Sequence, residues 1–230
     1  MSSESHIFNR LPVRHPAERR RASDGRGAVG LTGGVSSGKT TALRFFAELG
    51  ARVLSADGVV HSLYERADLQ AAIRARFGDE VIGSHVGVDR VSLARIVVSD
   101  EEAMRDLEAL VHPLVSEEIE NFIAGADPGS VVVCEVPLLV DVHAQCMFDF
   151  VVTIEAPART RRERAVGRLS SDVFDHLDAR LVGEAARRAA ADAAYTNSGS
   201  VEDLRAFCAL VYERARVLAA HEVGETVEDE

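Results

Sequence analysis

The chain of 230 residues predicts an α/β fold built on a parallel sheet. Short apolar runs alternate with helical patterns along most of its length, which is typical of a sheet covered by helices on both faces. The runs are apolar almost throughout, as expected for strands buried on both sides. The first run leads into a glycine-rich loop and then a helix, the context in which phosphate-binding loops occur.

The first predicted elements are a strand over residues 28–31 and an amphipathic helix over 41–49. Between them residues 33–40 read Gly-Gly-Val-Ser-Ser-Gly-Lys-Thr, which matches the phosphate-binding pattern G-x-x-x-x-G-K-[ST]. The alternative is an ordinary glycine turn before a helix, and the full match in this context disfavours it. We therefore predict that the chain binds a nucleoside triphosphate.

Each residue type in this loop has a physical reason. Glycines at 33, 34 and 38 allow backbone angles closed to other residues, so that loop amides can point at phosphate oxygens. The positive end of the following helix adds attraction. The Thr40 hydroxyl can ligate Mg²⁺. The predicted nucleotide-binding residues of this segment are Gly33, Gly34, Val35, Ser36, Ser37, Gly38, Lys39, Thr40 and Thr41.

Lys39 is the single lysine of the chain, and every other long basic side chain is arginine. Its ammonium group is a compact, mobile point charge that can reach the β- and γ-phosphates, where a planar guanidinium fits less well. We therefore expect Lys39 to act in both phosphate binding and catalysis.

A second, weaker strand is predicted over residues 52–55, and Asp57 follows it directly. Ligands of open α/β sheets bind at the carboxyl ends of strands, so Asp57 is a candidate proton acceptor or metal ligand. The alternative is a structural role as the cap of a helix over residues 58–64. The residues alone do not separate the two.

Only helical patterns occur between Asp57 and Asp127. Residues 69–77 have helical spacing and stop at Gly78, residues 92–97 form a shorter pattern, and Asp100 can cap a long helix. Pro113 lies within this last stretch and is expected to kink or break it. We predict a helical, substrate-holding insert over residues 58–125.

Further strands are predicted over residues 131–134, 150–154 and 194–196. Between the last two, Arg161, Arg164 and Arg168 have the spacing of one helical face. Arginines on a mobile helix suit the charge that develops on a transferring phosphoryl group. A solvated arginine face is the simpler interpretation, and the residues alone favour it.

The bulk composition excludes several classes. The net charge of −11 argues against a general nucleic-acid binder, although residues 1–27 carry six arginines against three acidic residues. We expect this stretch to be a disordered basic leader and residues 217–230 to be an acidic tail, frayed from His221. Three widely spaced cysteines form no disulfide or zinc pattern, and no apolar run is long enough to span a membrane. A cytoplasmic protein without membrane or nucleic-acid partners is expected.

A series of short motifs carries a resemblance to a known family. The motifs occur in a fixed order along the chain: Leu31-Thr32-Gly33-Gly34, the rest of the loop, Ala56-Asp57, His112-Pro113-Leu114, Val136-Pro137-Leu138-Leu139 and Asn197-Ser198-Gly199. This series resembles the dephospho-CoA kinase family from about Ala28 to Glu213. The loop is shared by many families, whereas its combination with the other motifs is much more specific.

The resemblance implies a P-loop kinase fold with a five-stranded parallel sheet, a core over residues 28–57 and 126–216, a helical CoA domain, and a lid near 158–190. It implies transfer of the γ-phosphate of ATP, with Mg²⁺, to the 3′-hydroxyl of the ribose of dephospho-CoA, by a monomer or small homo-oligomer. The residues that match the family's functional positions are Asp57 as general base, Arg164 and Arg168 as lid arginines, His112, Pro137 and Leu138 on the substrate side, and Asn197 near the adenine.

The chain also departs from the family pattern. Ser36 stands where glycine is common in the family, so a positive φ at this residue would be strained. Arg187 occupies a position where the family usually has lysine. The other departures are Ser55, Leu169 and Leu181. They leave open a catalytically weakened regulatory paralogue that binds ATP or CoA. Another P-loop nucleoside or nucleotide kinase is a second alternative, since such kinases share the loop, but the helical insert and the His-Pro-Leu motif argue against it. A GTPase is excluded, because its Asn-Lys-x-Asp motif would need a second lysine.

Overall fold

A computed structural model describes residues 25–83, 87–98 and 100–225 of the chain. The predicted leader falls almost wholly outside the described residues. The chain divides into two compact units. One comprises Met1–Val53 and Ile123–Glu230, and the other Leu54–Phe122.

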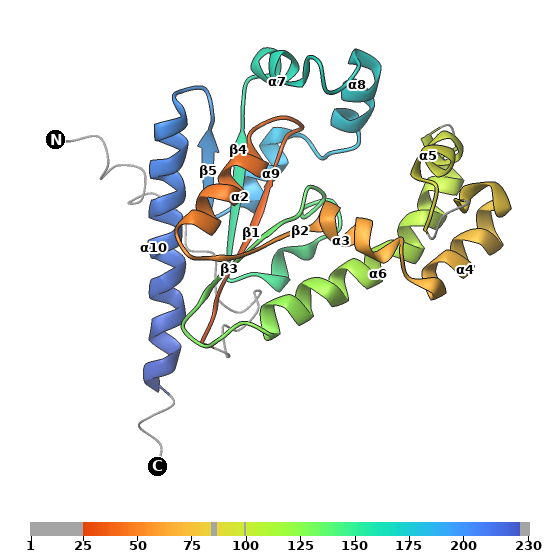
Figure 1. The fold of residues 1–230 in the computed structure, drawn as a ribbon. Helices are drawn as coiled ribbons and strands as arrows, with labels where there is room; N and C mark the ends of the chain where they lie inside the picture. Colours follow the sequence, from red (N-terminus) through yellow and green to blue (C-terminus); the bar gives the residue numbers. More distant parts are fainter. Residues whose placement is uncertain (1–24, 84–86, 99, 226–230) are drawn as a thin grey trace. The chain divides into compact units, whose positions relative to one another are not determined.

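The first unit is built on a five-stranded parallel sheet in the order β2-β3-β1-β4-β5 (Figure 1). The central strand β1 pairs in parallel with both β3 and β4, and β4 pairs in parallel with β5. All residues of β1, β3 and β4 are buried, which confirms the prediction from their apolar runs. The strands are β1 (Gly27–Gly33), β2 (Arg52–Ser55), β3 (Val131–Glu135), β4 (Phe150–Glu155) and β5 (Ala193–Thr196).

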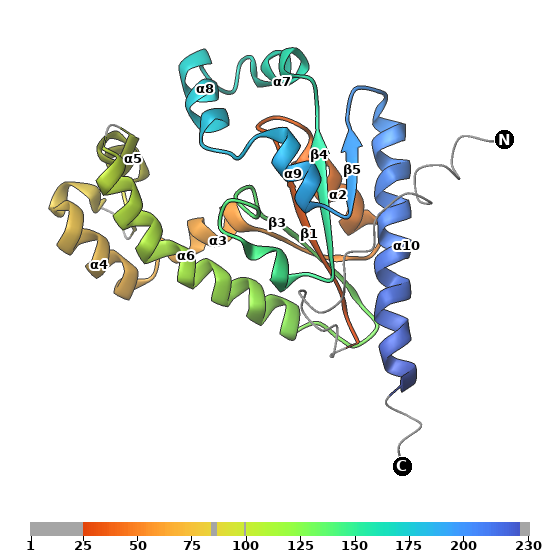
Figure 2. The same ribbon diagram turned by 180° about the vertical axis from the view of Figure 1, so that it is seen from behind.

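Helices cover both faces of this sheet. Helices α2 (Lys39–Glu48) and α10 (Val201–Glu225) pack together on one face, and α9 (Glu184–Ala190) lies on the other (Figures 1 and 2). The remaining elements of this unit are η3 (Ala144–Met147), α7 (Ala158–Ala165) and α8 (Ser171–Ala179).

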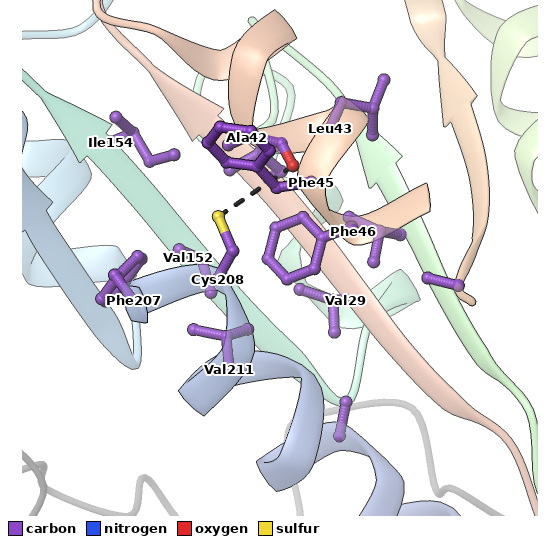
Figure 3. Packing of buried hydrophobic residues seen from close by; sticks show 14 of the residues in the cluster. Val29, Ala42, Leu43, Phe45, Phe46, Val152, Ile154, Phe207, Cys208 and Val211 are labelled. Atoms are coloured by element: carbon purple, nitrogen blue, oxygen red, sulfur yellow. Dashed lines mark hydrogen bonds between the residues drawn. The ribbon is translucent and has the colours of Figure 1, made fainter. Parts of the chain in front are cut away.

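The main core lies between the sheet, α2 and α10. Figure 3 shows Phe45 and Phe46 of α2 beside Val29 of β1 and Val211 of α10, all with no exposed surface. Cys208 is part of this core, with its Sγ 4.0 Å from the carbonyl oxygen of Ala42. Burial raises the pKa of the Cys208 thiol to about 12, so this cysteine acts as a small hydrophobe.

Helix α10 corrects the predicted acidic tail. It continues to Glu225, whereas the tail was expected from residue 217 and fraying from His221. Val211, Ala215 and Ala219 recur every four residues and have no exposed surface. One helical stripe therefore keeps contact with the core beyond the point where the charge pattern changes.

The second unit is helical. It has its own core, to which α3, α4, α5 and α6 all contribute side chains. Gly78 ends α4 with a φ of 94°, as its position predicted. The elements are α3 (Ala56–Leu63), α4 (Ala67–Phe77), η2 (Asp79–Val81), α5 (Arg90–Val98) and α6 (Glu101–Ala124), the last of which continues past the unit boundary.

Helix α6 confirms one expectation and corrects another. Oδ1 of Asp100 accepts hydrogen bonds from the backbone N–H groups of Glu102 and Ala103, at 2.9 and 3.2 Å, and so caps the helix as predicted. Pro113 was expected to kink or break this helix, and the break is wrong, because α6 runs through this residue. Within the described part of the chain, no helix combines the length and apolar character needed to cross a membrane.

Candidate phosphate-binding site

The loop between β1 and α2 depends on glycine at two positions. Gly33 and Gly38 have φ angles of 145° and 113°, which side chains disfavour. A Cβ atom on Gly33 would lie 2.0 Å from the carbonyl oxygen of Ile154. A Cβ atom on Gly38 would lie 2.3 Å from Nδ2 of Asn197. Both conformation and space therefore exclude a side chain, as the motif predicts.

Ser36, which stands where the family commonly has glycine, has a positive φ. Its φ is 56°, in the left-handed region that favours glycine. A non-glycine residue held there costs about 1–3 kcal/mol. Nη2 of Arg168 donates a hydrogen bond of 3.3 Å to the Ser36 hydroxyl, a contact that glycine could not make.

Lys39 is the first residue of α2, and its ammonium group folds back over the loop. Nζ donates to the carbonyl oxygens of Gly33 and Gly34, at 3.1 and 2.9 Å. The positive end of the helix dipole lies at the same point. The loop thus combines an ammonium group with the amino end of a helix, an arrangement suited to anions.

The other loop residues fit the same use. Thr40 and Thr41 lie in the first turn of α2, and Thr40 is exposed. The Ser37 hydroxyl is buried and has no hydrogen-bond partner in the described part of the chain. A bound phosphate oxygen is the kind of group that would satisfy such a donor.

Arg164 and Asn197 hold the middle of the loop. Nδ2 of Asn197 donates to the carbonyl oxygen of Ser37 at 2.8 Å, and Nη1 of Arg164 donates to the same oxygen at 3.2 Å. Nη2 of Arg164 also donates to the carbonyl oxygen of Asn197, at 3.1 Å. The predicted lid arginine and the predicted adenine-side residue therefore meet on the backbone of the loop.

Arg161 is a buried member of the same group. Its Nη1 lies 3.5 Å from the carbonyl oxygen of Val35, and its guanidinium binds both carboxylate oxygens of Asp178 on α8. It is only 9% exposed, so the solvated arginine face does not describe this residue. Asp178 was not predicted, because nothing in the local pattern marks a partner 17 residues further along the chain.

Arg168 corrects the helical spacing expected for the three arginines. Helix α7 ends at Ala165, and the backbone of Val166 leaves the helical region with a ψ of 134°. Arg168 lies in the turn beyond, where its guanidinium donates to the carbonyl oxygen of Arg164 and to Ser36. It reaches the loop from this turn and not from a helical face.

Asp57 lies in the helical unit, in the first turn of α3. The helix begins at Ala56 with Ser55 as its N-cap, so Asp57 is inside the helix and the capping alternative is wrong. Its side chain is exposed and forms no hydrogen bond or ion pair with any residue that the structure describes. The carboxylate is thus available to a ligand.

The remaining predicted residues have simpler surroundings. His112 is half-buried on α6, directly before Pro113. The carbonyl oxygen of Pro137 accepts a 3.0 Å hydrogen bond from the Thr32 hydroxyl, which ties the loop after β3 to β1. Leu138 is half-buried in the same loop. Their substrate roles stay predictions.

A buried ion pair between Glu155 and Arg187 is the main feature that sequence reasoning missed. The two residues are 32 positions apart, so no periodicity links them. The one available signal was the arginine at a position where the family usually has lysine.

No group of three or more His, Cys, Asp or Glu side chains that could hold a metal occurs among the described residues.

Comparisons with known proteins agree with this geometry. The sequence pattern of one family, dephospho-CoA kinase, matches residues 27–203. The chain belongs to the dephospho-CoA kinase family. The dephospho-CoA kinase of Frankia casuarinae is 40% identical over 180 residues, which are 77% of this chain and 79% of the relative. That of Thermobifida fusca is 38% identical over 189 residues, which are 80% and 94% of the two chains.

Solved structures share the fold. TT1252 from Thermus thermophilus matches with a TM-score of 0.69 and 29% identity, over 81% of this chain and 96% of its own. Dephospho-CoA kinase from Campylobacter jejuni matches with a TM-score of 0.57 over 83% of this chain and 98% of its own. At 23% identity the second match supports the fold alone.

Proposed function

We propose that the protein transfers the γ-phosphate of ATP to the 3′-hydroxyl of the ribose of dephospho-CoA, the last step of coenzyme A biosynthesis. Membership of the dephospho-CoA kinase family supports this function. The observation that carries it is the gathering of Lys39, Arg164 and Arg168 on one glycine loop. In a chain with a net charge of −11, three cations on one loop are suited to a polyphosphate.

The loop residues would bind and orient the triphosphate. Backbone amides of residues 33–38 and the ammonium group of Lys39 would bind the phosphate oxygens, and the Ser37 hydroxyl would gain the partner it lacks. Arg164 and Arg168 would exchange their carbonyl contacts for phosphate oxygens. Phosphoryl transfer needs little beyond such positioning and electrostatic stabilisation.

Asp57 would accept the proton of the ribose hydroxyl as its oxygen attacks the γ-phosphorus. The carboxylate is exposed and free of protein partners within the described residues, as a general base must be before its substrate binds. General-base help of this kind is worth about 10²–10⁴ in rate.

The residues also fit a magnesium ion. Mg²⁺ is usually held by substrate phosphates, waters and one or two protein oxygens, which agrees with an exposed Thr40 hydroxyl and the absence of a carboxylate cage in the described chain. When bound, the ion neutralises charge on the β- and γ-phosphate oxygens. His112, Pro137 and Leu138 would contact dephospho-CoA, and Asn197 would lie beside the adenine of ATP.

A coupled assay of ADP release tests the function. The full chain is incubated with ATP, Mg²⁺ and, in turn, dephospho-CoA, adenosine, other nucleosides and no acceptor. We expect that ADP is released only when dephospho-CoA is present. Preferential turnover of a nucleoside would favour the alternative nucleoside kinase. ATP binding without release for any acceptor would favour the regulatory paralogue.

A further inference from the structure

The last residue of β4 and a residue of α9 form a buried ion pair. Nε and Nη2 of Arg187 donate to Oε1 and Oε2 of Glu155, at 2.6 and 2.7 Å. The side chain of Arg187 is only 4% exposed and that of Glu155 only 1%. The Thr153 hydroxyl donates a further 2.7 Å hydrogen bond to Oε1. Each carboxylate oxygen therefore has a hydrogen-bond donor from the protein.

The two residues of the pair flank one segment of the chain, with Glu155 directly before it and Arg187 directly after it. Residues 156–186 leave the sheet directly after Glu155 and continue into helix α9, which carries Arg187, and they include Arg161, Arg164 and Arg168. Nη1 of Arg187 also donates to the carbonyl oxygen of Val182, near the end of this segment. The backbone N–H of Val182 in turn donates to Oδ1 of Asp141, at 2.8 Å.

The strand that carries Glu155 also runs beside the phosphate-binding loop. Gly33 at the start of the loop is the register partner of Ile154, the residue before Glu155, in the parallel pair of β1 and β4. A Cβ atom on Gly34 would lie 3.2 Å from Cδ of Arg161. Gly34 therefore packs against the start of the segment that leaves the sheet after Glu155.

We propose that Glu155 and Arg187 are positioning residues, which fix the base of segment 156–186 so that its arginines meet the phosphate-binding loop. This proposal depends on the proposed function in one respect, which is that ATP is the ligand of the phosphate-binding loop. A buried ion pair contributes little net stability compared with a well-packed apolar pair, which makes a purely stabilising role a poor explanation of the three donors to the Glu155 carboxylate.

Arginine suits this role better than lysine. The Arg187 guanidinium makes three directed contacts at once, two to Glu155 and one to the carbonyl oxygen of Val182. An ammonium group is a point charge without this planar geometry. The arginine at a position where lysine is usual thus gives this chain an additional contact between α9 and Val182, just before the helix begins.

The test compares three variants, Glu155→Gln, Arg187→Met and the double variant, by melting temperature and by ATP affinity in calorimetry. Each single variant leaves a buried partner unpaired, so both stability and ATP affinity should fall. The double variant removes both charges and should regain most of the melting temperature. Its ATP affinity should remain about tenfold or more below that of the wild type, because the segment is still untied.

Steady-state kinetics supply the second readout. We expect kcat/KM for ATP to fall by up to about 10²-fold in the double variant, while KM for dephospho-CoA stays close to that of the wild type. Val211→Ala is the matched control: it removes buried volume from α10, so it should lower the melting temperature and leave ATP affinity unchanged.

If a single variant does not fold, Arg187→Lys keeps the charge and takes its place. It should melt near the wild-type temperature and bind ATP more weakly. The proposal is overturned if ATP affinity simply follows melting temperature across all variants, or if the double variant binds ATP like the wild type. Because ATP binding needs no acceptor, inactivity of the wild type towards dephospho-CoA would overturn the proposed function and leave this test intact.

Discussion

Ser36 shows how one residue in the loop balances strain against a contact. Its φ of 56° favours glycine, and its hydroxyl accepts a hydrogen bond from Arg168. We expect Ser36→Gly to raise the free energy of unfolding by up to about 1 kcal/mol, because strain is relieved while the unfolded chain gains entropy. Urea denaturation measures the change.

Ser36→Ala is the control for this effect, because it removes the hydroxyl and keeps the strained backbone. It should not stabilise the protein. Equal stability of the glycine and alanine variants would show that the backbone angle carries no strain.

The proposed role of Asp57 as general base can be tested by a single substitution. Asp57→Asn keeps the size of the side chain and removes the proton acceptor. We expect kcat to fall by about two or more orders of magnitude while ATP affinity stays near normal. Steady-state turnover and calorimetric titration measure the two quantities, and near-wild-type turnover would remove Asp57 from the mechanism.

At the scale of elements, helix α10 makes the sharpest prediction. Ending the chain after Arg216 deletes two turns that include Ala219, which has no exposed surface, and Leu218, which packs against the core. We expect a loss of about 1–3 kcal/mol in the free energy of unfolding. A chain that ends at Glu225 is the control and should unfold at nearly the same urea concentration as the full chain. Equal stability of the shorter chain would mean that the last turns do not contribute.

The elements most visible in the sequence are the buried strands and the glycine loop. β1, β3 and β4 are continuous apolar runs, and the loop combines a fixed pattern with a strand before it and a helix after it. Helix ends are harder to predict, because packing overrides local signals. Pro113 stays inside α6, α10 continues through a charged stretch, and α7 ends before Arg168.

The site shows the same division between local and distant information. Lys39 and the glycines could be predicted, because their chemistry is encoded in eight consecutive residues. The partners of the arginines could not, since Asp178 and the carbonyl oxygens of Val35 and Ser37 are brought near only by the fold. Glu155 and Arg187 are a further case, in which two charged residues lie in the interior because each is the other's partner.

At the scale of the whole molecule, the buried ion pair between Glu155 and Arg187 makes the free energy of unfolding decrease at acid pH. Burial raises the pKa of Glu155, but hydrogen bonds from Arg187 and Thr153 and the nearby guanidinium charge bring it below its usual value. The unfolded value is about 4.3. The stabilisation is therefore fully present above about pH 4.3 and is lost as the pH falls through the lower folded value.

We expect the free energy of unfolding, measured by urea between pH 7 and pH 3, to decrease at the acid end less steeply in Glu155→Gln than in the wild type. Asp68, Asp89 and Asp203 also have lowered pKa values and contribute to the slope in both proteins. Parallel curves for the two proteins would show that the Glu155 carboxylate is not tied to Arg187 in the folded state.

The central claim is that Lys39 and its loop present ATP for transfer to the ribose 3′-hydroxyl of dephospho-CoA. The most direct test follows ATP, dephospho-CoA and Mg²⁺ by phosphorus NMR with the wild type, Lys39→Ala and Lys39→Arg. We predict that the wild type forms one 3′-phosphomonoester for each ADP, and that both variants form little, because neither restores the point charge. No 3′-phosphomonoester with the folded wild type, or near-normal turnover with Lys39→Arg, would contradict the account.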